Sequence, residues 1–221
     1  MTHTLEIDGV LLEFGPKRVL QDIYLKSETG KATGLLGRNG TGKSCLMKII
    51  FGELVPYDMS IRINGNAIYN SYRNPHDVRY LPQVRFIPKS LTIKRVFEDF
   101  ELDFSNFAHE FPDFKKFYKV KFKNLSGGEQ RIVEIYSILA SKTKFCLLDE
   151  PFSQVMPMHV ETIKSLILRE KKNKGIVITD HLYTHIIDIC DDIYVLKEGK
   201  TFLTKSLQDI ETLGYAKIGG F

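Results

Sequence analysis

The run from Gly37 to Ser44, "GRNGTGKS", constrains this chain more than any other stretch because it matches the phosphate-loop pattern G-x-x-x-x-G-K-[ST]. The apolar segment before it, "KATGLLG", is typical of a buried strand. The segment after it, "KSCLMKIIF", predicts a helix that ends at Gly52. A strand, a glycine-rich turn and a helix in this order let backbone N–H groups surround phosphate oxygens at a helix N-terminus. The sequence therefore predicts a nucleoside triphosphate site.

Two residues of this loop have specific expected roles. Lys43 is expected to reach the β- and γ-phosphates, and the hydroxyl of Ser44 is expected to bind Mg²⁺. An ordinary tight turn is the competing interpretation, and the flanking strand and helix disfavour it. The residues expected to contact ATP in and beside the loop are Gly37, Arg38, Asn39, Gly40, Thr41, Gly42, Lys43, Ser44 and Cys45.

A second element, an apolar strand that ends in two acidic residues, indicates which reaction the nucleotide undergoes. In "FCLLDE" an apolar strand ends in Asp149 and Glu150. At the carboxyl end of a strand, Asp149 is placed to hold Mg²⁺ through water, and Glu150 is placed to polarise an attacking water as general base. Two acids after a hydrophobic strand are a weak signal alone. Beside a phosphate loop they indicate nucleotide hydrolysis.

The rest of the chain alternates predicted strands and helices, which favours an α/β fold with a mostly parallel sheet. Alternating apolar residues predict strands over residues 4–30, joined by the turn "GPKR". Further strands are predicted at 78–83 and 175–180, helices at 131–140, 157–172 and 182–190, and hairpins at 60–69 and 191–203.

Residues 88–124 differ in character and predict a small helical insertion. Phe occupies positions 97, 100, 104, 107, 111, 114 and 117, a spacing that places the rings on one helical face. Pro112 and the helix-start candidates Asp103 and Ser105 predict two or three short helices. The favoured interpretation makes the Phe residues the core of the insertion, and the alternative is an apolar groove for a partner.

The end of this insertion, "FKKFYKVKFK", alternates lysine with aromatic residues. Such a mixture is compatible with binding to nucleic-acid phosphates or lipid head groups. The favoured interpretation is a solvated strap whose aromatic side chains turn to the core. Its lysines are Lys115, Lys116, Lys119, Lys121 and Lys123.

Bulk composition excludes some classes. The 221 residues carry a net charge of +4, which is too small to indicate nucleic-acid binding alone. Cys45, Cys146 and Cys190 show no CxxC spacing, so neither a disulfide framework nor a zinc site is expected, and a reducing intracellular compartment fits. No apolar run is long enough to predict a membrane span or a signal peptide.

The most specific motif is the signature motif, "LSGGEQR", from Leu125 to Arg131. Together with "GRNGTGKS", "YLPQ", "FCLLDE" and "ITDH", in that family's order, it makes the chain resemble an ABC-type ATP-binding cassette over nearly its whole length. The resemblance implies a RecA-like P-loop core with a mostly parallel sheet, an antiparallel β subdomain and a small helical insertion. It implies one domain over 1–221, with a core at 1–87 and 125–205, an insertion at 88–124 and a C-terminal tail at 206–221.

The same resemblance assigns roles to residues outside the phosphate loop. Glu150, His181 and Gln83 are the implied catalytic residues, and Phe14 is the implied adenine contact. The implied Mg²⁺ ligands are Ser44, Gln83 and Asp149. The implied cradle for the ATP of a facing copy of the cassette consists of Ser126, Gly127, Gly128 and Glu129.

One loop departs from the family pattern. The family usually continues the acidic strand with Ser-x-Leu-Asp, whereas this chain has "SQVM" at Ser153–Met156. The missing aspartate puts communication between the two ATP sites in doubt. We therefore expect reduced ATPase activity that is lost on Glu150→Gln.

Three functions remain open. The favoured one is the ATPase subunit of a transporter. We expect it to work as a dimer of cassettes, most simply a homodimer, at the cytoplasmic face of the membrane. It would dock on an integral membrane subunit, whose short helix enters a groove between Gln83 and the insertion. A slight similarity to export-type subunits, including those of lipopolysaccharide transport, names no cargo. The rivals are an ATPase acting on ribosomes or nucleic acid, disfavoured by the single cassette without a charged linker, and a weakly hydrolytic regulatory module.

Overall fold

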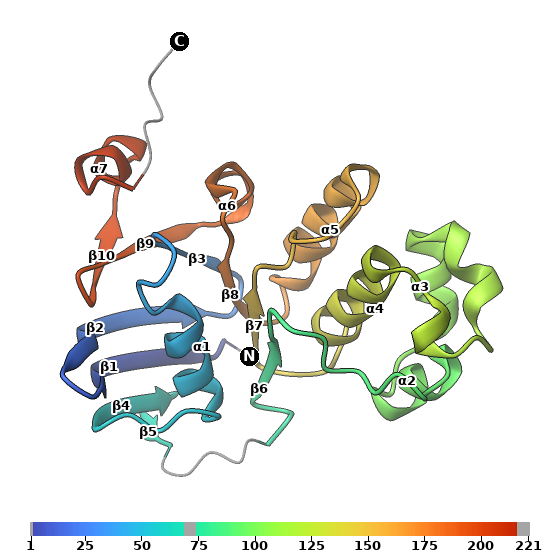
Figure 1. The fold of residues 1–221 in the computed structure, drawn as a ribbon, viewed down its shortest axis with the longest axis horizontal. Helices are drawn as coiled ribbons and strands as arrows, with labels where there is room; N and C mark the ends of the chain where they lie inside the picture. Colours follow the sequence, from blue (N-terminus) through green and yellow to red (C-terminus); the bar gives the residue numbers. More distant parts are fainter. Residues whose placement is uncertain (1, 69–73, 216–221) are drawn as a thin grey trace.

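A six-stranded sheet forms the centre of the computed structural model, which describes residues 2–68 and 74–215 (Figure 1). The strand order is β10-β9-β3-β8-β7-β6; β9 to β6 run parallel and β10 is antiparallel to β9. The predicted mostly parallel sheet is therefore confirmed. The strands are β3 (Ala32–Leu36), β6 (Val78–Leu81), β7 (Phe145–Asp149), β8 (Gly175–Thr179), β9 (Asp192–Lys197) and β10 (Lys200–Thr204).

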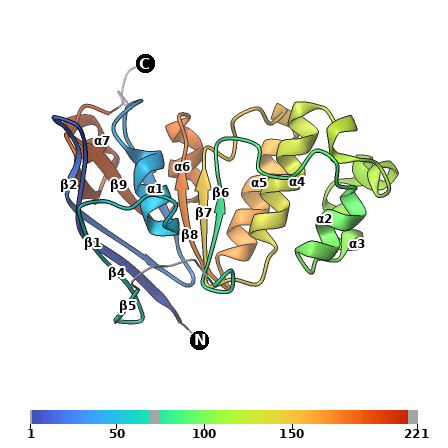
Figure 2. The same cartoon turned by 60° about the horizontal axis from the view of Figure 1, so that its bottom comes forward.

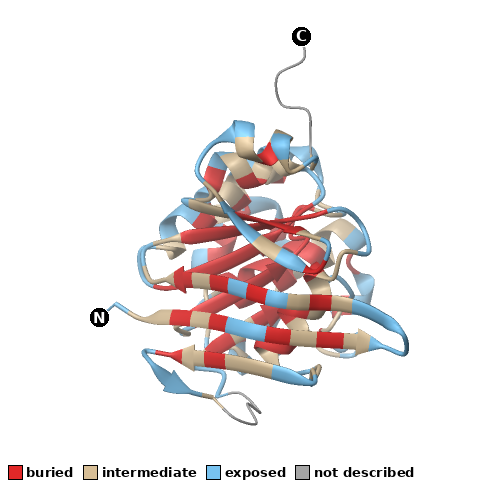
Figure 3. Cartoon of the chain, turned by 90° about the vertical axis from the view of Figure 1, so that its left-hand side faces the viewer, coloured by how far each residue is buried: buried red, intermediate tan, exposed pale blue. Residues whose placement is uncertain are grey.

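A second, antiparallel sheet has the strand order β2-β1-β4-β5. Its strands alternate buried and solvent-facing residues, as expected for a sheet with one covered face (Figure 3). Asn64 and Gly65 form the hairpin turn between β4 and β5, both with positive φ, and Glu198 and Gly199 do the same between β9 and β10. Both predicted hairpins are confirmed. The strands are β1 (Thr4–Phe14), β2 (Lys17–Glu28), β4 (Asp58–Ile63) and β5 (Asn66–Ala67).

Helices cover the central sheet on both faces. Helix α1 (Lys43–Phe51) lies between the two sheets, and its Leu46 and Ile49 share one buried cluster with residues of both (Figures 1 and 2). Helices α4 and α5 pack on the other face. The other helices described outside the insertion are α4 (Gly127–Leu139), α5 (Pro157–Glu170), α6 (Tyr183–Ile189) and α7 (Leu207–Thr212).

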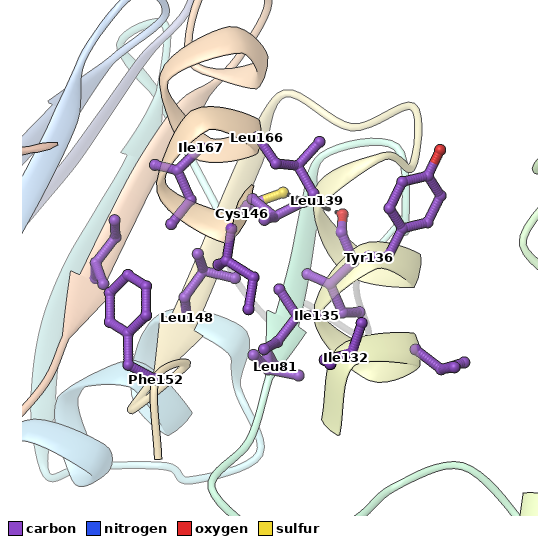
Figure 4. Close-up of a cluster of buried hydrophobic side chains, with 14 of the residues drawn as sticks. Leu81, Ile132, Ile135, Tyr136, Leu139, Cys146, Leu148, Phe152, Leu166 and Ile167 are labelled. Atoms are coloured by element: carbon purple, nitrogen blue, oxygen red, sulfur yellow. Dashed lines mark hydrogen bonds between the residues drawn. The ribbon is translucent and has the colours of Figure 1, made fainter. Parts of the chain in front are cut away.

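The core between α4, α5 and the sheet is continuous and apolar, as Figure 4 shows. Helix α4 buries nearly its whole length, and its apolar side chains meet those of β6, β7 and α5. Because β7 lies in this core on one face and meets α1 on the other, its carboxyl end is held rigidly. The labelled side chains are Leu81, Ile132, Ile135, Tyr136, Leu139, Cys146, Leu148, Phe152, Leu166 and Ile167.

Residues 93–124 form the elements expected of the insertion: α2 (Ile93–Asp99), α3 (Phe104–Glu110) and two 3₁₀ helices, η1 (Pro112–Phe117) and η2 (Phe122–Asn124). Phe97, Phe107, Phe111 and Phe114 are almost fully buried, and the Phe107 and Tyr136 ring centroids lie 4.9 Å apart. The aromatic stripe is therefore the core of the insertion, as expected.

Of the two helix-start candidates, Asp103 is the N-cap of α3. Its Oδ1 accepts a hydrogen bond from the backbone N–H of Ser105, which lies inside the helix. In the strap at 114–123, Phe114 and Phe122 are buried while all five lysines are exposed. The expected arrangement of this strap is confirmed.

In the part of the chain that the structure describes, no helix has the length and apolar character needed to cross a membrane. The expected first hairpin segment extends to residue 69 and the expected tail includes 216–221; these residues lie outside the described ranges.

Candidate nucleotide-binding and hydrolysis site

The phosphate loop connects β3 to α1, as the sequence predicts. Gly40 and Gly42 have φ of 77° and 106°, values that favour glycine. A β-carbon on Gly42 would also lie 2.8 Å from the Leu20 side chain of β2. The loop therefore needs glycine at these two positions to keep its conformation at the N-terminus of α1, where phosphates bind in loops of this type.

Lys43 is the most buried cation of this loop, with 6% of its surface exposed. Its Nζ donates hydrogen bonds to the carbonyl oxygens of Gly37 at 2.7 Å and Arg38 at 3.3 Å. Burial lowers the pKa of the Lys43 ammonium, and the nearby carboxylates of Glu150, Asp149 and Asp180 oppose that shift. Phosphate oxygens are further acceptors that suit an ammonium group at this position.

Asp149 ends β7 and is buried among hydrogen-bond donors. Its Oδ1 accepts from Thr179 Oγ1 at 2.7 Å, and its Oδ2 accepts from Tyr80 Oη at 3.1 Å. Burial, with the Asp149 charge, raises the pKa of the Tyr80 hydroxyl, so Tyr80 remains a donor. Two neighbouring strands therefore fix the orientation of this carboxylate.

Glu150 follows directly and has φ of 51°, an uncommon value for a residue other than glycine. Its Oε2 accepts a hydrogen bond from Gln83 Nε2 at 2.7 Å, and its Oε1 lies 2.7 Å from His181 Nε2. The structure thus brings together three residues that the sequence predicted to be catalytic. Strained backbone at a buried acid is frequent at functional sites.

A pocket of about 450 Å³ lies above the phosphate loop. It gathers most of the predicted ATP and catalytic residues, and it adds Lys17 and Val19 of β2, which sequence analysis missed. Phe14 lines it too and is 53% exposed, unlike a core strand residue. The lining residues are Phe14, Lys17, Val19, Asn39, Gly40, Gly42, Lys43, Ser44, Cys45, Gln83, Glu150 and His181.

Some predicted residues lie elsewhere. Gly37 and Asp149 do not line the pocket: Gly37 accepts a hydrogen bond from Lys43, and Asp149 accepts hydrogen bonds from Thr179 and Tyr80. Arg38 and Thr41 line a different pocket together with Leu196 and Tyr215, on another side of the loop.

Ser126, Gly127, Gly128 and Glu129 begin α4 and do not line the pocket. Ser126 Oγ accepts from the backbone N–H of Glu129, and Glu129 Oε2 accepts from that of Ser126. This capping box fixes the helix start. Ser126 and Gly127 are exposed, and the first-turn N–H groups of the two glycines have no partner within the helix.

Arg131 is a supporting residue that the sequence did not reveal. It is 1% exposed, and its guanidinium donates to the carbonyl oxygens of Pro82, Asp149 and Glu150 at 2.8, 2.9 and 3.0 Å. It therefore connects α4 to the backbone of Asp149 and Glu150. Its presence in the motif was visible, but burial of a charged side chain is rare enough that sequence gave no reason to expect it.

A phosphate loop between a strand and a helix, beside an acid-tipped strand of a mostly parallel sheet, defines a P-loop nucleoside-triphosphatase fold. Comparison with known proteins narrows the class. Residues 20–153 match the family model described as "ABC transporter", and the chain belongs to that family. The expected family resemblance is thereby confirmed.

Similar proteins agree. The chain is 34% identical to an ABC transporter ATP-binding protein of Rhizobium meliloti (strain 1021), over 95% of this chain and 83% of that protein. It is 31% identical to the lipopolysaccharide export system ATP-binding protein LptB of Escherichia coli (strain K12), over 93% of each chain. A solved "ATP binding subunit of ABC transporter" superposes with a TM-score of 0.80 at 22% identity, covering 96% and 93% of the two chains, which supports the fold.

The chain is therefore an ATP-binding and ATP-hydrolysing subunit of an ABC transporter. Subunits of this class dimerise and work with membrane transporter components.

Proposed function

We propose that two copies of this chain pair head to tail, and that each ATP is bound between the pocket of one copy and the start of α4 in the other. One observation carries this proposal. Lys43, Glu150 and His181 line the pocket, whereas Ser126 and Gly127 lie exposed outside it with a second set of unpaired N–H groups. Each copy thus presents two separate halves of a phosphate site.

Within the pocket, the loop amides and Lys43 bind the phosphates of ATP. Phe14 stacks on the adenine ring, with Val19 beside it and Lys17 at the rim, because an exposed aromatic at a pocket mouth offers its face to a planar base. The γ-phosphate reaches the partner's Ser126–Gly128 turn. Binding energy that depends on this phosphate favours the closed pair, and hydrolysis releases it.

The donor chemistry of the pocket fits Mg²⁺. The Ser44 hydroxyl and the Gln83 amide oxygen lie in the pocket lining, and the Asp149 carboxylate lies outside it. All three are oxygen donors, the type that Mg²⁺ prefers. Among the described residues no group of three or more His, Cys, Asp or Glu side chains forms a metal cage. That agrees with a metal held largely by substrate phosphates and water. When bound, Mg²⁺ neutralises developing charge on the phosphates.

Glu150 acts as the general base on the attacking water. Its carboxylate stands at the end of β7, next to Lys43 and held by Gln83 and His181. When His181 turns from Glu150 to the γ-phosphate and the Gln83 side chain moves off the carboxylate, the Glu150 oxygens become able to accept a proton. The Gln83 amide oxygen would then be free to help hold Mg²⁺. Gln83 begins the segment that leads to the insertion, so its movement is available to a docked partner.

The membrane partner is a separate integral membrane subunit, on whose cytoplasmic face this chain docks as a peripheral protein. We assign the surface between Gln83 and the insertion at 88–124 to a short helix of that subunit. In this division of the chain, 1–87 and 125–205 form the catalytic core and 206–221 the tail. Cargo choice belongs to the membrane subunit. The similarity to lipopolysaccharide export proteins favours testing an export-type partner first.

Action on nucleic acid is less well supported. Binding of single strands relies on aromatic rings presented to bases. In the lysine-rich strap Phe114 and Phe122 are buried and cannot stack on a base.

Association of the Glu150→Gln protein tests the proposal. With saturating Mg·ATP, sedimentation velocity is expected to show a dimer that Lys43→Ala abolishes, and pull-down from native membranes is expected to yield an integral membrane protein. A strictly monomeric Glu150→Gln protein, both free and on its membrane partner, would overturn the paired-site proposal.

A further inference from the structure

Arg85 lies two residues beyond Gln83, and its guanidinium joins three segments that are far apart in the sequence. Nη1 donates to Glu134 Oε2 of α4 at 3.1 Å. Nη2 donates to the carbonyl oxygen of Gly127 at 2.5 Å and to Gln154 Oε1 at 2.7 Å. One side chain therefore connects the segment that follows Gln83, the helix α4 and the turn after β7.

Glu134 anchors the same segment a second time. Its side chain is fully buried, and its Oε1 accepts hydrogen bonds from the backbone N–H groups of Phe86 at 3.0 Å and Ile87 at 3.5 Å. The backbone that follows Gln83 is thus attached to α4 through a buried carboxylate as well as through Arg85. A displacement of this segment must be shared with α4.

Gln154 brings the third segment against the signature turn. It has φ of 65°, and a β-carbon on Gly128 would lie 3.1 Å from its carbonyl oxygen. The backbone of Gln154 therefore lies close to the start of α4, and its side chain is connected to Gly127 through Arg85. Gln154 lies in the loop that lacks the family's aspartate, where Met156 stands instead.

These contacts are poorly explained as helix stabilisation. A cation near a helix N-terminus opposes the helix dipole, so the approach of Arg85 to Gly127 disfavours α4 electrostatically. The forked guanidinium instead satisfies two acceptors on α4 and one on the turn after β7 at once, which fixes the relative position of these two segments and of the segment that carries Arg85.

We propose that Arg85 and Gln154 are positioning residues that set the first turn of α4 relative to Gln83 and Glu150 of the same subunit. The inference rests on the proposed role of that turn at the partner's ATP. A change at Gln83 in one ATP site is transmitted through Arg85 to the Gly127 and Gly128 N–H groups that serve the other site. This link within one subunit compensates for the aspartate missing from the 153–156 loop.

Association in the Glu150→Gln background tests the link. Gln154→Ala is expected to weaken Mg·ATP-driven dimerisation by about tenfold, the effect of losing one hydrogen bond to a charged group. Arg85→Ala removes all three bonds of the guanidinium and is expected to weaken dimerisation at least as much. ATP affinity, measured with a fluorescent nucleotide on dilute monomer, is expected to stay within about twofold because neither residue lines the pocket. The combined variant is expected to weaken association less than the product of the single effects.

Two further variants are the controls. Gln154→Glu keeps an acceptor for Arg85 and is expected to retain dimerisation. Arg95→Ala removes an exposed arginine of the insertion, which pairs with Asp99 at 2.8 Å on the same helix, and is expected to leave dimerisation unchanged.

The outcomes separate this inference from the proposed function. A Glu150→Gln parent that fails to dimerise rejects the paired-site proposal itself. A parent that dimerises while Gln154→Ala and Arg85→Ala match it within twofold overturns the positioning role alone. Equal losses of ATP affinity and association would show a general structural defect and would also overturn it.

Discussion

Gln83 Nε2 donates a 2.7 Å hydrogen bond to Glu150 Oε2, although 67 residues separate them in the chain. His181 Nε2 lies equally close to the other carboxylate oxygen. Both carboxylate oxygens of Glu150 therefore already have a partner within the same subunit. If Glu150 is the general base, as proposed, Gln83 and His181 must exchange it for other partners before it can accept a proton from water.

Glu150→Gln is expected to lower the ATP turnover number by about 10²–10⁴-fold, the usual contribution of a general base. ATP binding should persist, because the amide keeps the size of the side chain and Lys43 is unchanged. Phosphate release at saturating Mg·ATP measures the first effect and equilibrium binding the second. Turnover equal to that of the unmodified protein would contradict the assignment of Glu150.

The pH dependence of ATP affinity should report on Lys43. Burial lowers the pKa of Lys43 in the free protein, and ATP phosphates stabilise its ammonium form, so the pKa rises on binding. Affinity is then greatest at pH values below the lowered pKa. It falls by up to about tenfold per pH unit as the pH rises through that value. Titration of ATP at fixed salt from pH 7 to pH 10 gives the profile.

Cys45→Ala is the control for this profile, because the Cys45 thiol lines the same pocket and its ionisation would also repel ATP. Its pKa is raised by burial. The alkaline fall should remain in Cys45→Ala. A flat profile in that variant would assign the fall to the thiol and reject the role of Lys43.

Thiol alkylation provides an independent view of the pocket. Burial raises the pKa of Cys45, so at pH 7 it should react with N-ethylmaleimide more slowly than a free cysteine and faster as the pH rises. ATP at ten times its Kd should slow the reaction about tenfold by occupying the site. Peptide mass spectrometry after timed quenching measures the rate at each cysteine.

Cys146 is the internal reference for that experiment. It is fully buried in β7, and burial raises its pKa to about 11, so it should remain unmodified with or without ATP. Alkylation of Cys45 at one rate in both conditions would argue against ATP lying over Ser44 and Cys45.

Local patterns sufficed to predict much of this site. The strand and helix around Gly37–Ser44, the acidic end of β7 and the helix start at Ser126 each depend on neighbours in sequence, where spacing and turn chemistry are visible. The Asn64-Gly65 and Glu198-Gly199 hairpins were found for the same reason, since both turns need positive φ.

Contacts that depend on tertiary placement were missed. Lys17 and Val19 line the pocket only because the antiparallel sheet folds beside the phosphate loop. Arg85 reaches Gln154 across 69 residues, and no periodicity encodes which acceptor a long, flexible cation will meet. Arg38 was predicted to contact ATP because it belongs to the loop. Its side chain instead donates to the carbonyl oxygen of Gly214, away from the pocket.

Arg131 should be the residue of the signature motif on which stability depends most. Arg131→Met keeps an unbranched apolar side chain but leaves the buried carbonyl oxygens of Pro82, Asp149 and Glu150 without this donor, and it removes a cation 3.7 Å from the buried Glu134 carboxylate. Breaking a buried charged network costs about 3–5 kcal/mol, against a total free energy of unfolding of about 5–15 kcal/mol. Urea unfolding followed by circular dichroism measures the change, with Arg169→Met as matched control.

Arg169 is half exposed and pairs with Glu110 at the surface, so its loss should cost no more than about 1 kcal/mol. Equal midpoints for the two variants would show that the buried guanidinium contributes no more to stability than an exposed one.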